Sequence, residues 1–156
     1  MARPPLDNFA MLLATAGGTG LLPWAPGSFG SLVGVAIAAL VVPILGVSAL
    51  LVVCLILFLG GWWAAGRVAR ASAIADPGFV VIDEVVGQSL VLATVPPSIV
   101  NYAGGFVLFR LFDILKPWPI DAVERRFHNG FGIMADDLMA AVYAGVALYC
   151  IVKILE

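Results

Sequence analysis

Two pairs of adjacent acids, Asp83-Glu84 and Asp136-Asp137, stand within otherwise apolar stretches of this chain. Only 12% of the residues are charged, and the mean hydropathy is +1.08. An ionised carboxylate is costly to place near a bilayer, so clustered acids in such a sequence indicate a functional site. Carboxylate oxygens are the ligands that Mg²⁺ prefers, and we therefore predict that these pairs hold a cation.

Helix capping is a second explanation for the acid pairs. Each pair lies where an apolar helix is expected to begin, and acids in a first turn complement the helix dipole. Two adjacent acids, twice, in a chain with only ten acidic residues exceed what capping requires. Adjacent helical positions point about 100° apart, so one acid of each pair would bind an ion directly while its neighbour orients water or a second ion. The sequence leaves open which acid binds.

Three charged residues at intervals of three, Arg110, Asp113 and Lys116, form one polar stripe on an apolar helix. The stripe is compatible with an ordinary salt-bridged helix end whose cations reach the membrane interface. Beside the acid pairs, it would instead provide cations for phosphate oxygens and a carboxylate for metal binding or proton transfer. His128 is the single histidine, which excludes a mechanism with two histidines, and we expect it in a solvated loop.

A segment rich in glycine and proline, residues 17–31, leads directly into an apolar helix. Its glycines would let backbone N–H groups approach an anion, and the helix N-terminus adds a favourable dipole. We predict phosphate binding here, with Ser28 or Ser31 as the helix cap. The candidate phosphate-binding residues of this segment are Gly18, Thr19, Gly20, Gly27 and Ser28. An irregular loop is the alternative, and no lysine follows the glycines as a nucleotide-binding Walker loop requires.

The composition is that of a membrane protein. Of the 156 residues, 62% are hydrophobic, against about 45–50% in a typical soluble domain. Continuously apolar stretches favour helices over a transmembrane β-barrel, whose segments alternate in polarity. We therefore predict an all-α polytopic membrane bundle of four or five apolar helices, forming one domain over residues 1–156. The net charge of −2 gives no basic surface for nucleic acid.

Prolines and glycines divide the apolar sequence into helices. Pro43 and Gly46 interrupt the first long apolar run, which predicts a helical hairpin. A second hairpin is expected from one arm over residues 80–95 and another over residues 99–115, separated by two prolines. The last apolar helix is expected over residues 134–154.

Basic residues collect on the cytoplasmic side of membrane proteins. With Arg3 inside, two returning hairpins place seven of the eight Lys and Arg residues at or near the cytoplasmic face and leave only Lys153 beyond the last helix. The same topology brings five acids to one leaflet: Asp83, Glu84, Asp113, Asp136 and Asp137. We therefore predict a single site at the cytoplasmic face, made from segments that are distant in the sequence.

Four blocks spread over roughly residues 14–145 carry specific strings. They are Gly18-Thr19-Gly20 with Pro26-Gly27-Ser28, Asp83-Glu84 with Gly87, Phe109-Arg110 through Lys116-Pro117-Trp118-Pro119-Ile120, and Gly132-Ile133-Met134 with Asp136-Asp137. In these strings the chain resembles the bacterial phosphatidylglycerophosphatase A family. The resemblance implies a Mg²⁺-dependent lipid phosphatase of the bacterial inner membrane, which hydrolyses the phospholipid phosphatidylglycerophosphate to phosphatidylglycerol and phosphate.

The expected mechanism combines these groups around one phosphate. Mg²⁺ would bind the phosphate and polarise a water, while cations and glycine-segment amides neutralise the phosphate oxygens. The expected metal ligands are drawn from Asp83, Glu84, Asp136 and Asp137, and the expected cations are Arg110 and Lys116. Asp113 would serve as a further ligand or base, and an aspartyl-phosphate intermediate stays open.

Two other functions also fit membrane carboxylates. A small divalent-cation transporter would set them near the membrane midplane on broken helices. A non-catalytic membrane subunit would need them for assembly rather than for turnover. The small number of spans is compatible with a homodimer, but the sequence fixes neither the oligomeric state nor the number of metal ions.

Overall fold

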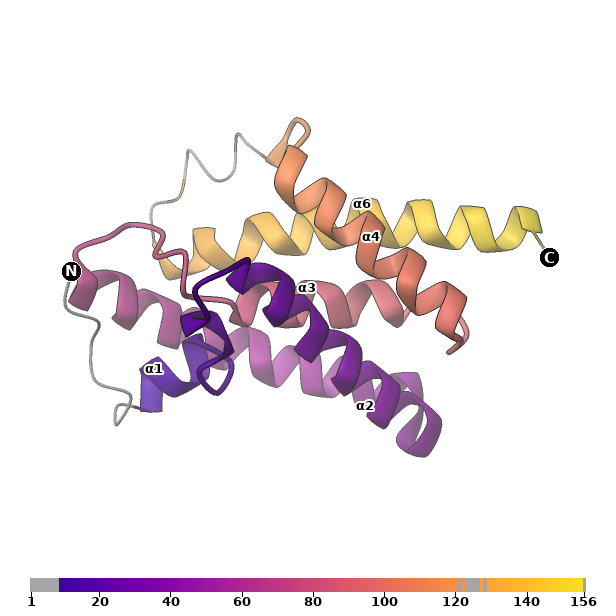
Figure 1. The fold of residues 1–156 in the computed structure, drawn as a ribbon, viewed down its shortest axis with the longest axis horizontal. Helices are drawn as coiled ribbons and strands as arrows, with labels where there is room; N and C mark the ends of the chain where they lie inside the picture. The colour runs from indigo at the N-terminus through magenta and orange to yellow at the C-terminus, as the bar shows by residue number, and fades with distance from the viewer. Residues whose placement is uncertain (1–8, 121, 123–126, 128, 156) are drawn as a thin grey trace.

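The computed structural model describes residues 9–120, 122, 127 and 129–155. Over these residues the regular structure is helical, which confirms the predicted all-α fold (Figure 1). In chain order the elements are α1 (Phe9–Ala14), the 3₁₀ turn η1 (Thr19–Leu21), α2 (Pro26–Ser72), α3 (Ile82–Leu92), α4 (Ile99–Leu115) and α6 (Gly130–Leu155).

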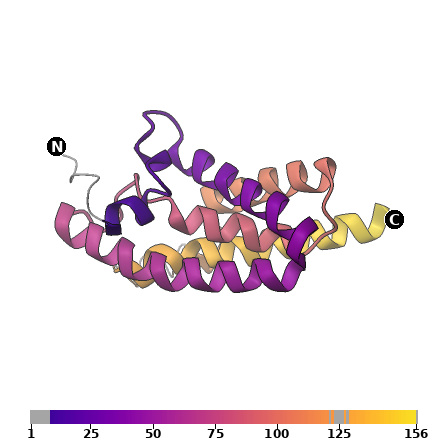
Figure 2. The same cartoon turned by 90° about the horizontal axis from the view of Figure 1, so that it is seen from below.

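Helix α2 folds back on itself at Gly46. The backbone of Gly46 has φ 82° and ψ 171°, a conformation that residues with a Cβ rarely adopt. The resulting arms, residues 26–45 and 47–72, run back alongside each other (Figure 2). Ala38 on the first arm and Leu50 on the second are fully buried in the same core cluster. The predicted hairpin is therefore confirmed, and both ends of α2 lie at the same end of the molecule.

Helix α3 lies at the centre of the bundle and is shorter than predicted. It has 11 residues, most of them buried, and it packs against both α2 and α6. About 20 residues are needed to cross a bilayer, so α3 is too short to span it, although a span was expected over residues 80–95.

Helix α4 agrees with the prediction for the second arm of this hairpin, because it covers Ile99–Leu115. Ser98 caps it, since the Ser98 hydroxyl accepts a hydrogen bond from the Asn101 N–H at 3.1 Å.

Helix α6 begins at Gly130, before the start expected at residue 134. The Asn129 side chain accepts hydrogen bonds from the N–H groups of Phe131 and Gly132, at 3.0 and 3.1 Å, and so caps the helix. A Cβ at Gly130 would lie 2.6 Å from the backbone nitrogen of Gly66, so glycine lets the start of α6 pack closely on α2. Because α6 starts earlier than expected, Asp136 and Asp137 lie beyond its first turn.

The outer surfaces of α2 and α6 are apolar. In the most apolar 18-residue window of α2, 11% of the residues are buried inside the protein, and in that of α6, 28% are buried. The core helix of a soluble protein would be mostly buried. Within the described part of the chain, these are the two helices that are long and apolar enough to cross a membrane. Their exposed apolar surface indicates membrane association.

Candidate functional site

Three carboxylates from two helices converge at one point of the bundle. They belong to Asp83 and Glu84 in the first turn of α3 and to Asp137 in α6. One oxygen from each lies within 4.8 Å of the others. Asp83 and Asp137 are only 9% and 4% exposed, and Glu84 is partly buried. Carboxylates held this close repel one another, so a cation among them would stabilise the group.

Two oxygens of this acid cluster are left without a hydrogen bond by the described part of the chain. Among the described residues, Glu84 Oε2 and Asp137 Oδ2 are buried without a hydrogen-bond donor. A buried polar atom left unpaired costs on the order of 1–3 kcal/mol, and a divalent cation with oxygen ligands would remove that cost. The acid cluster, defined as Asp83, Glu84 and Asp137, therefore fits a metal ion both in the chemistry of its donors and in its unsatisfied atoms.

Arg110 of α4 adjoins the acid cluster. Its Nη1 atom lies 3.8 Å from Glu84 Oε1 and 2.5 Å from Asp113 Oδ2. The carboxyl group of Asp113 also lies against that of Asp137. Arg110 and Asp113 from the predicted polar stripe are thus in contact with the acid cluster, and a cation and a further carboxylate stand beside the candidate metal position.

Asp136 and Asp137 have different surroundings. Asp136 Oδ2 accepts a hydrogen bond of 2.7 Å from Lys116 Nζ, whereas Asp137 belongs to the acid cluster. Both acids lie beyond the first turn of α6, which contains no acid, so complementing the helix dipole explains neither of them. In the first pair, by contrast, Asp83 and Glu84 both join the acid cluster. Which acid of each pair binds an ion directly stays a prediction.

The N-terminus of α2 lies directly against this site. A Cβ at Gly27 would collide with Glu84 Oε1 and would come within 3.0 and 3.1 Å of two guanidinium nitrogens of Arg110. Ala25 occupies the N-cap position, without a side-chain hydrogen bond, and Pro26 opens the helix. The predicted caps are therefore wrong: Ser28 lies inside the first turn of α2, and the hydroxyl of Ser31 donates to Gly27 O at 3.0 Å.

The earlier part of the glycine segment, Gly18 to Gly20, makes its described contacts elsewhere. The Thr19 hydroxyl lies 3.1 Å from the carbonyl oxygens of both Thr15 and Ala16, to which it donates. Gly20 is pressed against the Phe79 carbonyl, where a Cβ would collide. These contacts close the turn after α1, and phosphate binding by Gly18, Thr19 and Gly20 stays a prediction.

Gln88 was not among the predicted site residues. It follows Glu84 by one helical turn on α3, it is fully buried, and neither polar atom of its amide has a hydrogen-bond partner within the described residues. The i, i+4 spacing from Glu84 in an apolar helix was the available signal in the sequence.

Some predicted positions lie outside the described residues. They are His128, which was expected in a solvated loop, and three of the basic residues used to predict the orientation: Arg3, Arg125 and Arg126.

We expect Gly27→Ala to lower activity strongly, by about 10²-fold, because the added methyl would displace Glu84 and Arg110 from each other. Gly78→Ala is the matched control, since a Cβ there meets nothing within 4 Å. The measurement is the rate of phosphate release by each purified variant, with thermal unfolding to check that both fold. Equal rates for the two variants would contradict this account of Gly27.

Comparison with known proteins finds one matching family and several similar proteins. Residues 12–152 match the family described as Phosphatidylglycerophosphatase A. Relatives of that name come from Haemophilus influenzae, 40% identical over 94% of this chain and 90% of the relative, and from Escherichia coli, 36% identical over 96% and 87%. A Bacteroides thetaiotaomicron protein with the provisional name phosphatidylinositol-3-phosphatase is 36% identical over 95% of each chain. No solved structure matches the chain.

Proposed function

This chain belongs to the phosphatidylglycerophosphatase A family, and we propose that its acid cluster is the catalytic centre that hydrolyses the terminal phosphate of phosphatidylglycerophosphate. The family confirms the predicted activity, a phosphomonoesterase of phospholipid metabolism. The observation that carries the proposed site is the pair of unpartnered buried oxygens, Glu84 Oε2 and Asp137 Oδ2, beside the guanidinium of Arg110.

Mg²⁺ is the ion that we propose for this centre, held by Asp83, Glu84 and Asp137. These residues supply only hard oxygen donors, with no histidine or thiolate in the cluster that would favour zinc. Bound there, the ion would supply charge neutralisation and an activated water for the hydrolysis. Asp136 contributes indirectly in this proposal, because its hydrogen bond fixes Lys116 beside the residue that precedes Asp137.

Arg110 and the start of α2 bind the substrate phosphate in this proposal. A guanidinium can donate two parallel hydrogen bonds to phosphate oxygens. The first N–H groups of a helix have no partner within the helix, so the Gly27 N–H can donate to the same phosphate with support from the helix dipole. The Ser28 N–H already donates to Ala25 O at 2.9 Å, so its hydroxyl is the group of Ser28 that would contact the phosphate. Gly27 lies close to Arg110, since a Cβ at Gly27 would come within 3.0 Å of the guanidinium, and this closeness supports one phosphate meeting both.

Asp113 is the proposed proton acceptor. Its carboxyl group touches both Arg110 and Asp137, and therefore stands between the group that binds phosphate and the group that binds metal. In this position it holds Arg110 in place and can take a proton from the attacking water. Unaided hydrolysis of phosphate monoesters is extremely slow, so positioning and charge neutralisation together must supply a large rate enhancement.

We place the site at the cytoplasmic face of the bacterial inner membrane, at the level of the lipid headgroups. The C-terminal end of α2, which carries Arg67 and Arg70, lies on the same side of the molecule as the start of α6, and the end of α6 that carries Lys153 lies on the opposite side (Figure 1). This distribution favours the cytoplasmic orientation. A cation transporter is less well supported, because its carboxylates would lie at the midplane rather than near helix ends.

Removal of divalent metal is expected to abolish phosphate release from phosphatidylglycerophosphate by the purified protein, and added Mg²⁺ is expected to restore it. The reason is that the acid cluster brings its carboxylates close together without a protein cation for every oxygen. The assay measures phosphate released in detergent micelles before chelation, after chelation and after Mg²⁺ is returned. Undiminished release in excess chelator would contradict the metal assignment, and no release under any condition would contradict the proposed activity.

A further inference from the structure

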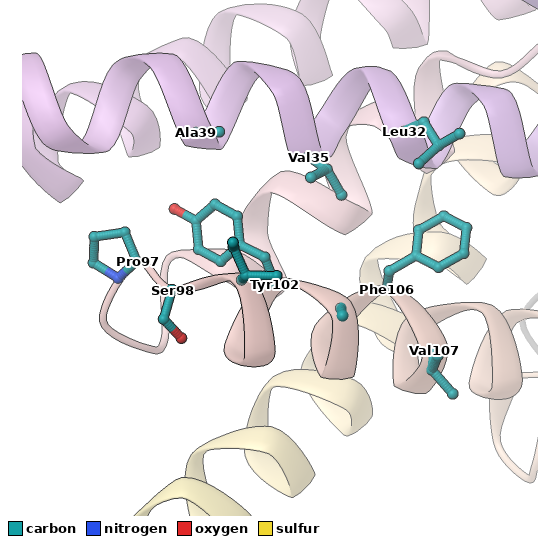
Figure 3. A pocket seen from close by; sticks show the side chains of 10 residues that line it. Leu32, Val35, Ala39, Pro97, Ser98, Tyr102, Phe106 and Val107 are labelled. Carbon is teal, nitrogen blue, oxygen red and sulfur yellow. The ribbon is translucent and has the colours of Figure 1, made fainter.

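An apolar groove opens between the first arm of α2 and α4 (Figure 3). Its volume is about 580 Å³, within the range of roughly 300–1,000 Å³ found for small-molecule sites. The side chains that matter here are Leu32, Val35 and Ala39 from α2 and Tyr102, Phe106 and Val107 from α4. The rings of Tyr102 and Phe106 lie in the space between the two ribbons.

The groove begins close to the proposed phosphate site. Along α4, Phe106 precedes Arg110 by about 6 Å, and along α2, Leu32 follows Gly27 by about 7.5 Å, from a rise of about 1.5 Å per residue. Gly27 and Arg110 lie close together, since a Cβ at Gly27 would come within 3.0 Å of the guanidinium. The two helices that flank the proposed phosphate site therefore also form the walls of the groove, so a molecule bound at Arg110 can extend into it.

We propose that this groove holds one acyl chain of the phospholipid whose terminal phosphate is bound at Arg110, an inference that rests on the proposed function. The lining suits a hydrocarbon chain rather than a polar headgroup or a charged peptide. The groove is open at its side, where Ile99 is 90% exposed and Val107 is 63% exposed. Since these exposed apolar residues belong in hydrocarbon, a chain can enter laterally from the bilayer.

Tyr102 gives a second indication that the groove is completed by another molecule. The Tyr102 side chain is 8% exposed, and within the described residues its buried hydroxyl has no hydrogen-bond partner. Such a hydroxyl is costly in an apolar surrounding. A ligand that combines a hydrocarbon chain with an acceptor, such as the ester oxygen of a phospholipid, fits both the lining and this unsatisfied donor.

The test fills the groove from each wall. Val107→Trp and Ala39→Trp place an indole in the groove, and Val146→Trp on α6 is the matched control, because Val146 is 61% exposed and lies outside the groove. Each variant is assayed on long-chain phosphatidylglycerophosphate and on the same headgroup without acyl chains. We expect the ratio of the two kcat/KM values to fall about tenfold in both groove variants, as when roughly two buried methylene contacts are lost, and to stay unchanged in the control.

An unchanged ratio in both groove variants, with the native protein active, would overturn the acyl-chain site alone. A native protein inactive on both substrates would instead overturn the proposed function, and lipid labelling then tests the groove separately. Phosphatidylglycerophosphate and phosphatidylcholine, each with a photoreactive acyl chain, are compared for labelling of residues 32–39 and 99–107. We expect about tenfold more labelling by the lipid with the phosphomonoester, whereas equal labelling would mean that bulk lipid fills the groove and would overturn the proposal. Loss of labelling on dimerisation would assign the groove to a second copy, with the same consequence.

Discussion

Replacing Asp137 by asparagine is expected to lower kcat on phosphatidylglycerophosphate by about 10³-fold, since the substitution removes one charged oxygen from the proposed metal site. Asp137 is the α6 member of the acid cluster, and its Oδ2 atom is buried without a partner among the described residues. Asparagine has nearly the same shape, so the fold should be kept. The measurement is phosphate release in micelles over a range of Mg²⁺ concentrations, in which the variant should also require more Mg²⁺.

Asp136→Asn is the matched control for this prediction. The two residues are adjacent on α6 and similarly buried, but Asp136 pairs with Lys116 instead of joining the acid cluster. We therefore expect a smaller loss, about 10- to 10²-fold, of the size found for residues that orient a metal ligand or a neighbouring group. Equal losses for the two variants would show that the distinction between them is wrong. Loss of folding without loss of turnover per folded molecule would show that these acids serve assembly rather than catalysis.

The helices and their order could be predicted from the sequence because the signals are local. Pro43 with Gly46 interrupts an apolar run, and the glycine conformation at the bend confirms the hairpin. The α4 boundaries also agreed, since Ser98 provides a cap. Two returning hairpins predicted that distant acids meet, and the structure brings Asp83, Glu84 and Asp137 within one cluster although α3 is too short for the span that this prediction assumed.

Other features depend on packing between segments, which no local pattern encodes. The glycine segment looked like one phosphate loop, but Gly27 lies against Arg110 while Gly20 lies against the Phe79 carbonyl. Different surroundings for Asp136 and Asp137 were expected from the angle of about 100° between adjacent helical positions, but the pairing of Asp136 with Lys116 and of Asp137 with the acid cluster depends on which segments pack against α6. Gln88 was overlooked because a single amide in an apolar helix has no distinctive spacing beyond its distance from Glu84.

Arg110→Lys is expected to lower kcat by about 10²-fold although the positive charge is kept. Lysine cannot donate two parallel hydrogen bonds, so it would not bind phosphate oxygens as a guanidinium does, and removing one such donor typically costs about 10²–10³-fold in rate. The ion pair with Asp113, at 2.5 Å, would also be altered, which would misplace the proposed proton acceptor. The measurement is kcat and KM on phosphatidylglycerophosphate at saturating Mg²⁺.

Arg67→Lys is the control for the loss of a guanidinium as such. Arg67 lies near the proposed cytoplasmic surface with its guanidinium carbon 5.5 Å from the centre of the Trp63 ring, and it is not among the residues of the site. A lysine there keeps the charge that favours the orientation, so we expect activity within about twofold of the native protein, as is usual for surface substitutions. A comparable loss of activity in both variants would mean that Arg110→Lys lowers kcat by destabilising the fold and not by weakening phosphate binding. A loss confined to Arg110→Lys, with an unchanged requirement for Mg²⁺, would separate phosphate binding by the guanidinium from metal binding by the acid cluster.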